Sequence, residues 1–171
     1  MADDYGGVLG AFPYAFRASD SWLLRSYVVL GGLLTVAVSA LFVTAVIGVI
    51  AGTTGGRGGN LTLSRSFFAV VGLFVVVPLV APVLFVARRH RRRDAAAGDT
   101  RYDAALALAG YLFVGALYVG VVISVPPAQQ TTPTGLFAPV VATLYALPQP
   151  VGVVPPLVAA GAIGLVHRWF R

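Results

Sequence analysis

The segment AALALAGYLFVGALYVGVVISV, residues 104–125, contains no charged side chain, and the uncharged run that it begins continues to residue 166. Two shorter uncharged runs precede it, at residues 26–56 and 66–87. A charged side chain at the centre of a lipid bilayer costs at least about 2.5–3.5 kcal/mol, so segments that face lipid exclude charge. The three runs therefore predict an all-α, multi-span integral membrane protein.

Composition favours the same class. Hydrophobic residues make up 58% of the chain and charged residues only 11%, whereas soluble domains carry about a quarter charged residues. A chain of 171 residues has room for four spans of about 20 residues each and short connections. No stretch outside the spans is long enough for an ordinary soluble domain.

We predict a single four-helix transmembrane domain over residues 26–167, preceded by a cytoplasmic interfacial segment at 1–25 and followed by a cytoplasmic tail at 168–171. Its spans are expected at residues 27–51, 67–87, 104–125 and 151–167. Ser19 or Asp20 is the expected N-cap of the first span, because a short side-chain oxygen can accept the unpaired N–H groups of a helix start.

Prolines shape two of the spans. Pro78 and Pro82 lie one turn apart in the second span, and each removes a backbone donor, so we expect a kink there. Residues 136–166 would form a helix of about 46 Å, too long for a hydrocarbon core of about 30 Å. We therefore expect a proline-broken outer segment, in which residues 136–147 are re-entrant or interfacial, before a short last helix.

Arginine placement predicts the orientation. All twelve basic residues are arginine, and with four spans ten of them lie on the side of both termini. The opposite side holds only Arg57 and Arg65. Because cytoplasmic loops carry an excess of basic residues, both termini are expected in the cytoplasm. Asn60 begins an Asn-Leu-Thr glycosylation sequon in a loop assigned to the outside, which agrees with this orientation.

The basic cluster between the second and third spans has two compatible interpretations. It is a topogenic signal that keeps this loop inside, and it is a patch for anionic lipid headgroups, which attract a nearby basic side chain by about 1 kcal/mol. Its arginines are Arg88, Arg89, Arg91, Arg92 and Arg93. The same placement accounts for the basic net charge of +6 without a nucleic-acid partner.

Few residues offer chemistry. His90 and His167 are the only histidines, and neither has partners at metal-ligand spacing, so we expect no metal site. Asp99 and Asp103 flank Arg101 and are expected to form exposed ion pairs with it. The predicted spans contain no ionisable group of the kind that proton-coupled carriers use, and the chain offers no nucleophile–base pair. We therefore expect neither an enzyme nor a cofactor.

Small residues recur at helical spacing in three spans. Such stripes let helix backbones approach closely, which is how helices associate in lipid. We expect them to pack helices within the chain, with contact to another subunit as the alternative. The stripes are Ala40, Thr44, Gly48 and Gly52 in the first span, Ala116, Gly120 and Ser124 in the third, and Ala160 and Gly164 in the fourth.

Tyr111 and Tyr118 are seven residues apart and share one face of the third span. Their hydroxyl groups are expected to bond backbone carbonyls that Pro78 or Pro82 leaves free. The alternative is a polar pocket that these two tyrosines form with Tyr145 and Gln149 near the outer leaflet.

These patterns predict a small, non-enzymatic membrane protein. We expect an accessory or structural subunit of a membrane assembly, either a homo-oligomer or part of a larger complex, located in the cell membrane. The alternative is a compact transporter or channel for a neutral solute or an ion that uses the helix break at 136–156. A membrane-bound enzyme or lipid-processing protein is the third interpretation.

Overall fold

Every element that the computed structural model describes is a helix. The described residues are 7–51, 59–92 and 100–170, and the side chains of residues 59–68 and 92 lie outside this description. The helices are α1 (Gly7–Ala18), α2 (Trp22–Ala51), α3 (Gly59–Arg92), α4 (Thr100–Ile123), η1 (Pro127–Gln129), α5 (Ala138–Tyr145), η2 (Gln149–Val153) and α6 (Val154–Trp169). The all-α fold class is therefore confirmed.

Four helical stretches are long and apolar enough to cross a membrane. They are Trp22–Ala51, Ala69–Arg91, Thr100–Ile123 and Gln149–Trp169. Each contains 21 residues or more, whereas about 20 residues are needed to cross the hydrocarbon core.

Two of these helices begin earlier than the charge pattern predicts. α2 starts at Trp22, and its cap is neither Ser19 nor Asp20: the hydroxyl of Ser21 accepts the N–H of Leu24 at 3.3 Å. The N-cap prediction was wrong because the Ser19 hydroxyl is engaged in another contact, a hydrogen bond to Asp103. α3 starts at Gly59, so Asn60 lies in the first turn of a helix rather than in a loop.

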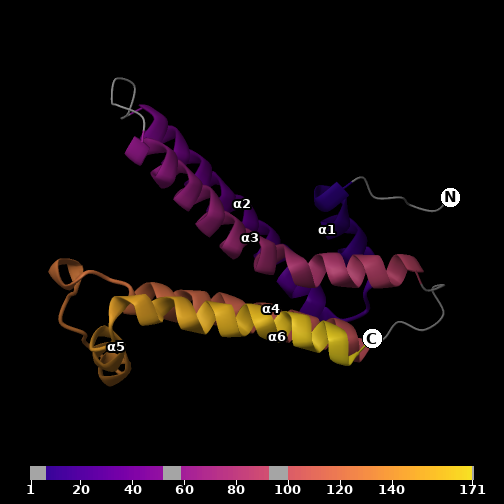
Figure 1. Ribbon diagram of the computed structural model, residues 1–171. Coiled ribbons are helices and arrows are strands. Elements are labelled where there is room, and N and C mark those ends of the chain that lie inside the picture. Colours follow the sequence, from indigo (N-terminus) through magenta and orange to yellow (C-terminus); the bar gives the residue numbers. More distant parts are fainter. Residues whose placement is uncertain (1–6, 52–58, 93–99, 171) are drawn as a thin grey trace. The chain divides into compact units, whose positions relative to one another are not determined.

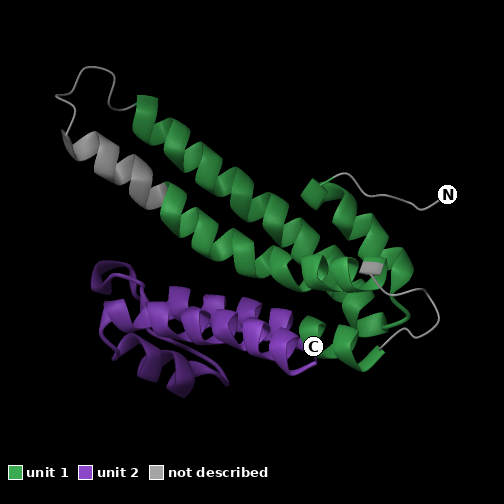
Figure 2. Ribbon diagram, turned by 45° about the vertical axis from the view of Figure 1, so that its right-hand side comes forward, with its two compact units in different colours: residues 1–107 green, residues 108–171 purple. Residues whose placement is uncertain are grey.

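The chain divides into two compact units, residues 1–107 and 108–171 (Figure 2). In the first unit α2 and α3 run side by side, and α1 packs on both of them near the start of α2 (Figure 1). Buried side chains gather at this end. They include Ala11 and Ala15 of α1, Leu24 and Tyr27 of α2, and Leu79, Val83 and Val86 of α3.

α3 changes direction along its length (Figure 1), and it contains both Pro78 and Pro82. Each proline lacks the N–H that would bond to the preceding turn, which is a common cause of helix kinks. The carbonyl oxygen of Leu79, between the two prolines, accepts the hydroxyl of Tyr27 at 2.8 Å. A side chain of α2 thus bonds the backbone of α3 between its two prolines.

In the second unit, α6 lies beside the part of α4 that belongs to it (Figures 1 and 2). The last turn of α4 touches η2 with its backbone. A Cβ atom built on Gly120 would lie 2.3 Å from the carbonyl oxygen of Gly152, so both positions require glycine. The two ends of the segment 124–153, which contains α5, therefore meet.

Candidate functional site

Three side chains from distant parts of the first unit meet in a buried polar cluster. Ser19 lies in the connection between α1 and α2, His90 in the last turn of α3, and Asp103 in the first turn of α4. The Ser19 hydroxyl donates to Asp103 Oδ2 at 2.5 Å, and His90 Nε2 lies 2.9 Å from the same oxygen. One carboxylate oxygen therefore joins three helix ends.

Asp103 is almost fully enclosed. The residue is 1% exposed, and its second oxygen, Oδ1, has no hydrogen-bond partner. The predicted exposed ion pair between Asp103 and Arg101 was therefore wrong: Arg101 is exposed, while the carboxylate turns inward to His90. Asp99 lies outside the described residues.

Hydrogen bonds that involve the backbone hold the turn around Ser19 in place. The Ser19 hydroxyl accepts the N–H of Ser21 at 3.1 Å. Arg25 reaches back from the first turn of α2, and its Nε donates to the carbonyl of Ser19 at 2.8 Å. These bonds fix the turn between α1 and α2, so the hydroxyl is presented to Asp103 with little freedom.

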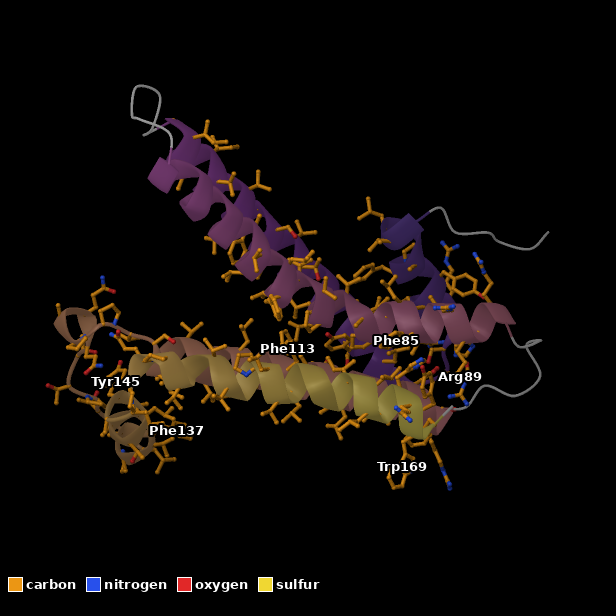
Figure 3. The ribbon with its side chains drawn as sticks, in the orientation of Figure 1. Phe85, Arg89, Phe113, Phe137, Tyr145 and Trp169 are labelled. Carbon is orange, nitrogen blue, oxygen red and sulfur yellow. The ribbon has the colours of Figure 1, made fainter. Side chains whose placement is uncertain are left out.

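A second contact joins the same two helix ends beside the cluster. The guanidinium of Arg89 lies 4.0 Å from the centre of the Tyr102 ring, and Tyr102 is buried. A cation over an aromatic face is attracted by about 0.5–2 kcal/mol. Figure 3 shows Arg89 in the last part of α3. One arginine of the basic cluster is thus engaged in packing.

The hydrogen bonds of the cluster differ from those of an activated serine nucleophile. A serine nucleophile is activated when its hydroxyl donates to an imidazole base, whereas Ser19 donates to the carboxylate. Within the described part of the chain, no group of three or more His, Cys, Asp or Glu side chains is placed to hold a metal ion. The arrangement joins helix ends across 84 positions of sequence.

The small-residue stripes have different surroundings. Ala40, Thr44 and Gly48 are exposed on α2, and Gly52 lies outside the described residues. In α4, Ala116 is half-buried and Gly120 is buried against Gly152. Ser124, just beyond this helix, donates its hydroxyl to the Gly120 carbonyl at 2.8 Å. In α6, Ala160 is half-buried and Gly164 is exposed.

Comparison with known proteins identifies a family for this chain. A family profile described as a domain of unknown function, DUF8056, matches residues 1–171. The chain belongs to the DUF8056 family. Searches of curated proteins and of solved structures returned no match.

The four residues of this DUF8056 protein that were predicted to form a polar pocket all belong to the second unit. Tyr118 is 71% exposed, and the carbonyl of Leu79, between the two prolines of α3, accepts the hydroxyl of Tyr27; bonds from Tyr111 and Tyr118 to the carbonyls that the prolines free stay a prediction. Tyr111 and Tyr145 are half-buried, and Gln149 is exposed. A polar pocket formed by these residues stays a prediction.

The structure describes the side chains of some arginines in the basic cluster of the DUF8056 protein. Arg88 and Arg91 are exposed and Arg89 is half-buried. The side chain of Arg92 and all of Arg93 lie outside the described residues. His167 is half-buried in the last turn of α6.

Proposed function

We propose that this DUF8056 protein is a multi-pass protein of the cell membrane with both termini in the cytoplasm. We further propose that it acts as a non-enzymatic accessory or structural subunit of a membrane assembly. The observation that carries the multi-pass membrane assignment is that the four long helices expose many large apolar side chains.

Exposed apolar side chains cover α2 and α3 beyond the end where α1 packs. They include Leu33, Val36, Leu41, Val43 and Ile47 of α2, and Val70, Leu73, Phe74 and Val77 of α3. Soluble monomers rarely expose apolar patches larger than a few hundred Å². In a bilayer the same surface faces acyl chains and carries no such cost.

The ends of two spans have the side chains expected at a membrane surface. Trp22 begins α2 and Trp169 ends α6, and both indole rings are exposed. Arg25 and Arg168 lie in the terminal turns of these helices. Tryptophan and arginine at span ends anchor helices at the headgroup level, so these positions support a cytoplasmic interface there.

The basic cluster supports the orientation and a lipid partner. Arg88 and Arg91 are exposed at the end of α3, where the positive-inside rule places arginine in the cytoplasm. Anionic headgroups are attracted to such side chains. We propose that the cluster contacts anionic lipids of the cytoplasmic leaflet.

Two observations support a subunit rather than a catalyst. The buried polar cluster joins helix ends, which is a structural task. Ala40, Thr44 and Gly48 leave one face of α2 small and exposed, which permits close approach of a helix from another chain.

Cysteine labelling tests the membrane orientation. The natural sequence contains no cysteine, so Ala96→Cys and Gln130→Cys each introduce a unique thiol. In intact cells an impermeant maleimide should label the Gln130→Cys variant and leave the Ala96→Cys variant unlabelled until the membrane is opened. Equal labelling of the two variants in intact cells would refute the orientation.

Native mass spectrometry of the complex extracted in mild detergent tests the subunit role. Foreign subunits in a constant proportion, or a homo-oligomer that Gly48→Leu dissociates, would support it. A lone monomer that carries a solute or an ion across reconstituted vesicles would replace this proposal by the compact transporter or channel that uses the 136–156 segment.

A further inference from the structure

We propose that Leu136, Phe137 and Val140 form an apolar edge that inserts into the acyl-chain region of the outer leaflet, close to the headgroups. This inference rests on the proposed membrane function and names the partner of one segment, the acyl chains of lipid. Residue types and hydropathy alone do not distinguish a re-entrant from an interfacial segment here; the short helix and the exposed polar residues of the second unit favour the shallow position.

The segment leaves and returns at one membrane face. Gly120 in the last turn of α4 and Gly152 just before α6 are in backbone contact, so residues 124–153 start and finish at the same level. α5 contains 8 residues and is therefore about 12 Å long, whereas the hydrocarbon core measures about 30 Å. A helix of this length lies within one leaflet.

The apolar edge is uncovered by the chain itself. Leu136 is 88% exposed and Phe137 is 71% exposed, and Val140 one turn later is also exposed. Ala138, Val141 and Tyr145 of α5 are half-buried, so α5 turns a different face toward the chain. Figure 3 shows Phe137 and Tyr145 in this part of the second unit.

The amino-acid composition of the chain around the apolar edge favours lipid over water as the environment of these side chains. Residues 104–166 contain no charged side chain, although a loop of this length in water would need solvated groups. Other helices of the second unit also expose apolar side chains, including Val121 of α4 and Val153, Val154, Leu157 and Val158 next to or in α6. The edge is thus accompanied by exposed apolar side chains on other elements of the same unit.

The polar residues of the same segment mark the other side of the interface. Gln129, Thr131 and Thr132 are exposed and precede the edge by only a few residues. Amide and hydroxyl groups keep their hydrogen bonds in the headgroup region, while the leucine and phenylalanine are stabilised among the acyl chains. We therefore expect the edge to lie shallow and Thr132 to remain in water.

Tryptophan fluorescence in vesicles tests this position. In a full-length Trp22→Phe, Trp169→Phe background, a single tryptophan is introduced at Phe137, at Leu136 in a second variant, or at Thr132 as the control. The protein is reconstituted in phosphatidylcholine whose acyl chains are brominated near the headgroup end or near the methyl end. Both leaflets carry bromine, so the orientation of the reconstituted protein does not affect the result.

The expected result is blue-shifted emission from Phe137→Trp and Leu136→Trp, quenched more by the shallow than by the deep bromines. Thr132→Trp should emit at longer wavelength and be quenched by aqueous acrylamide. Unquenched emission at both edge positions would overturn the proposal, whether acrylamide reaches them or a second copy covers them. Stronger quenching by the deep bromines would overturn the shallow position in favour of a re-entrant segment.

Leu112→Trp separates this proposal from the function on which it rests. Leu112 is exposed near the middle of α4, so the deep bromines should quench it if α4 spans the bilayer. Quenching at Leu112 without quenching at the edge overturns the edge alone. Absence of quenching at all of these positions overturns the membrane function as well.

Discussion

Asp103 shows how one side chain determines the packing of several helix ends. Its carboxylate accepts hydrogen bonds from Ser19 and lies against His90, yet its Oδ1 atom is buried without a partner. Removing one member of a buried pair costs more than removing both, because the remaining polar group loses its partner in a place that water does not reach.

We expect His90→Leu to lower the free energy of unfolding by about 3 kcal/mol, since it leaves the Asp103 carboxylate buried beside Ser19 alone. The double variant His90→Leu, Asp103→Leu should lose clearly less than the sum of the two single variants. Thermal unfolding of the purified protein in detergent measures the four states of this cycle. Additive losses would contradict the coupling, and Arg88→Leu at an exposed position serves as the control.

The Tyr27 hydroxyl gives a second prediction at this scale. It donates to the Leu79 carbonyl at 2.8 Å, and Tyr27→Phe removes this hydroxyl while keeping the ring, so we expect a loss of about 1 kcal/mol in the free energy of unfolding. Tyr118→Phe is the matched control, because the Tyr118 side chain is 71% exposed. Equal midpoints for the two variants in thermal unfolding would show that the Tyr27 hydroxyl does not stabilise the fold.

At the level of single residues, the sequence showed which positions carry small side chains, but not what surrounds each of them in the folded chain. Gly120 was predicted to lie in a packed face, and the structure places it against Gly152. Gly48 has the same residue type and spacing, yet a Cβ atom built on it meets nothing within 4 Å. Spacing along one helix cannot reveal which face another helix covers.

At the scale of elements, close backbone contact between α4 and η2 positions the return of the chain into α6. A methyl group on Gly120 would collide with the Gly152 carbonyl, while one on Gly115, in the same helix, would meet open space. Substitution by alanine is therefore expected to have opposite effects on stability at these two glycines.

We expect Gly120→Ala to lower the free energy of unfolding by about 1–3 kcal/mol through overpacking. Gly115→Ala should raise it by up to about 1 kcal/mol, because alanine has the higher helix propensity. Denaturation midpoints of the two purified variants provide the comparison. A stabilised Gly120→Ala variant would show that α4 and η2 are not in contact in the folded protein.

The sequence predicted which long helices exist more accurately than it predicted where each helix begins. Uncharged runs located the four long helices, but α3 begins at Gly59 instead of residue 67. The polar residues Asn60, Thr62 and Arg65 favoured a loop, because they do not belong to an apolar run. Hydropathy reports the part of a helix that lies in lipid, not the part that continues outside it.

For the whole molecule, charge distribution predicts orientation. Replacing Arg88, Arg89, Arg91, Arg92 and Arg93 by glutamine reduces the arginines on the proposed cytoplasmic side from ten to five, against two on the other side. We therefore expect a minority of inverted molecules, since the bias weakens without reversing. Labelling of the Ala96→Cys thiol in intact cells measures that fraction, and no increase would show that this cluster does not help to orient the chain.

The amino-acid sequence by itself determined that the chain forms long apolar helices, because charge is excluded over whole spans and such a pattern needs no knowledge of neighbours. It also supplied the asymmetry of arginine on which the orientation depends. Only the tertiary structure decided that Asp103 turns inward to Ser19 and His90, and that Gly120 rather than Gly48 meets another backbone. These contacts join residues far apart in the chain, and their energies depend on distance and burial, which a linear pattern of residue types does not contain.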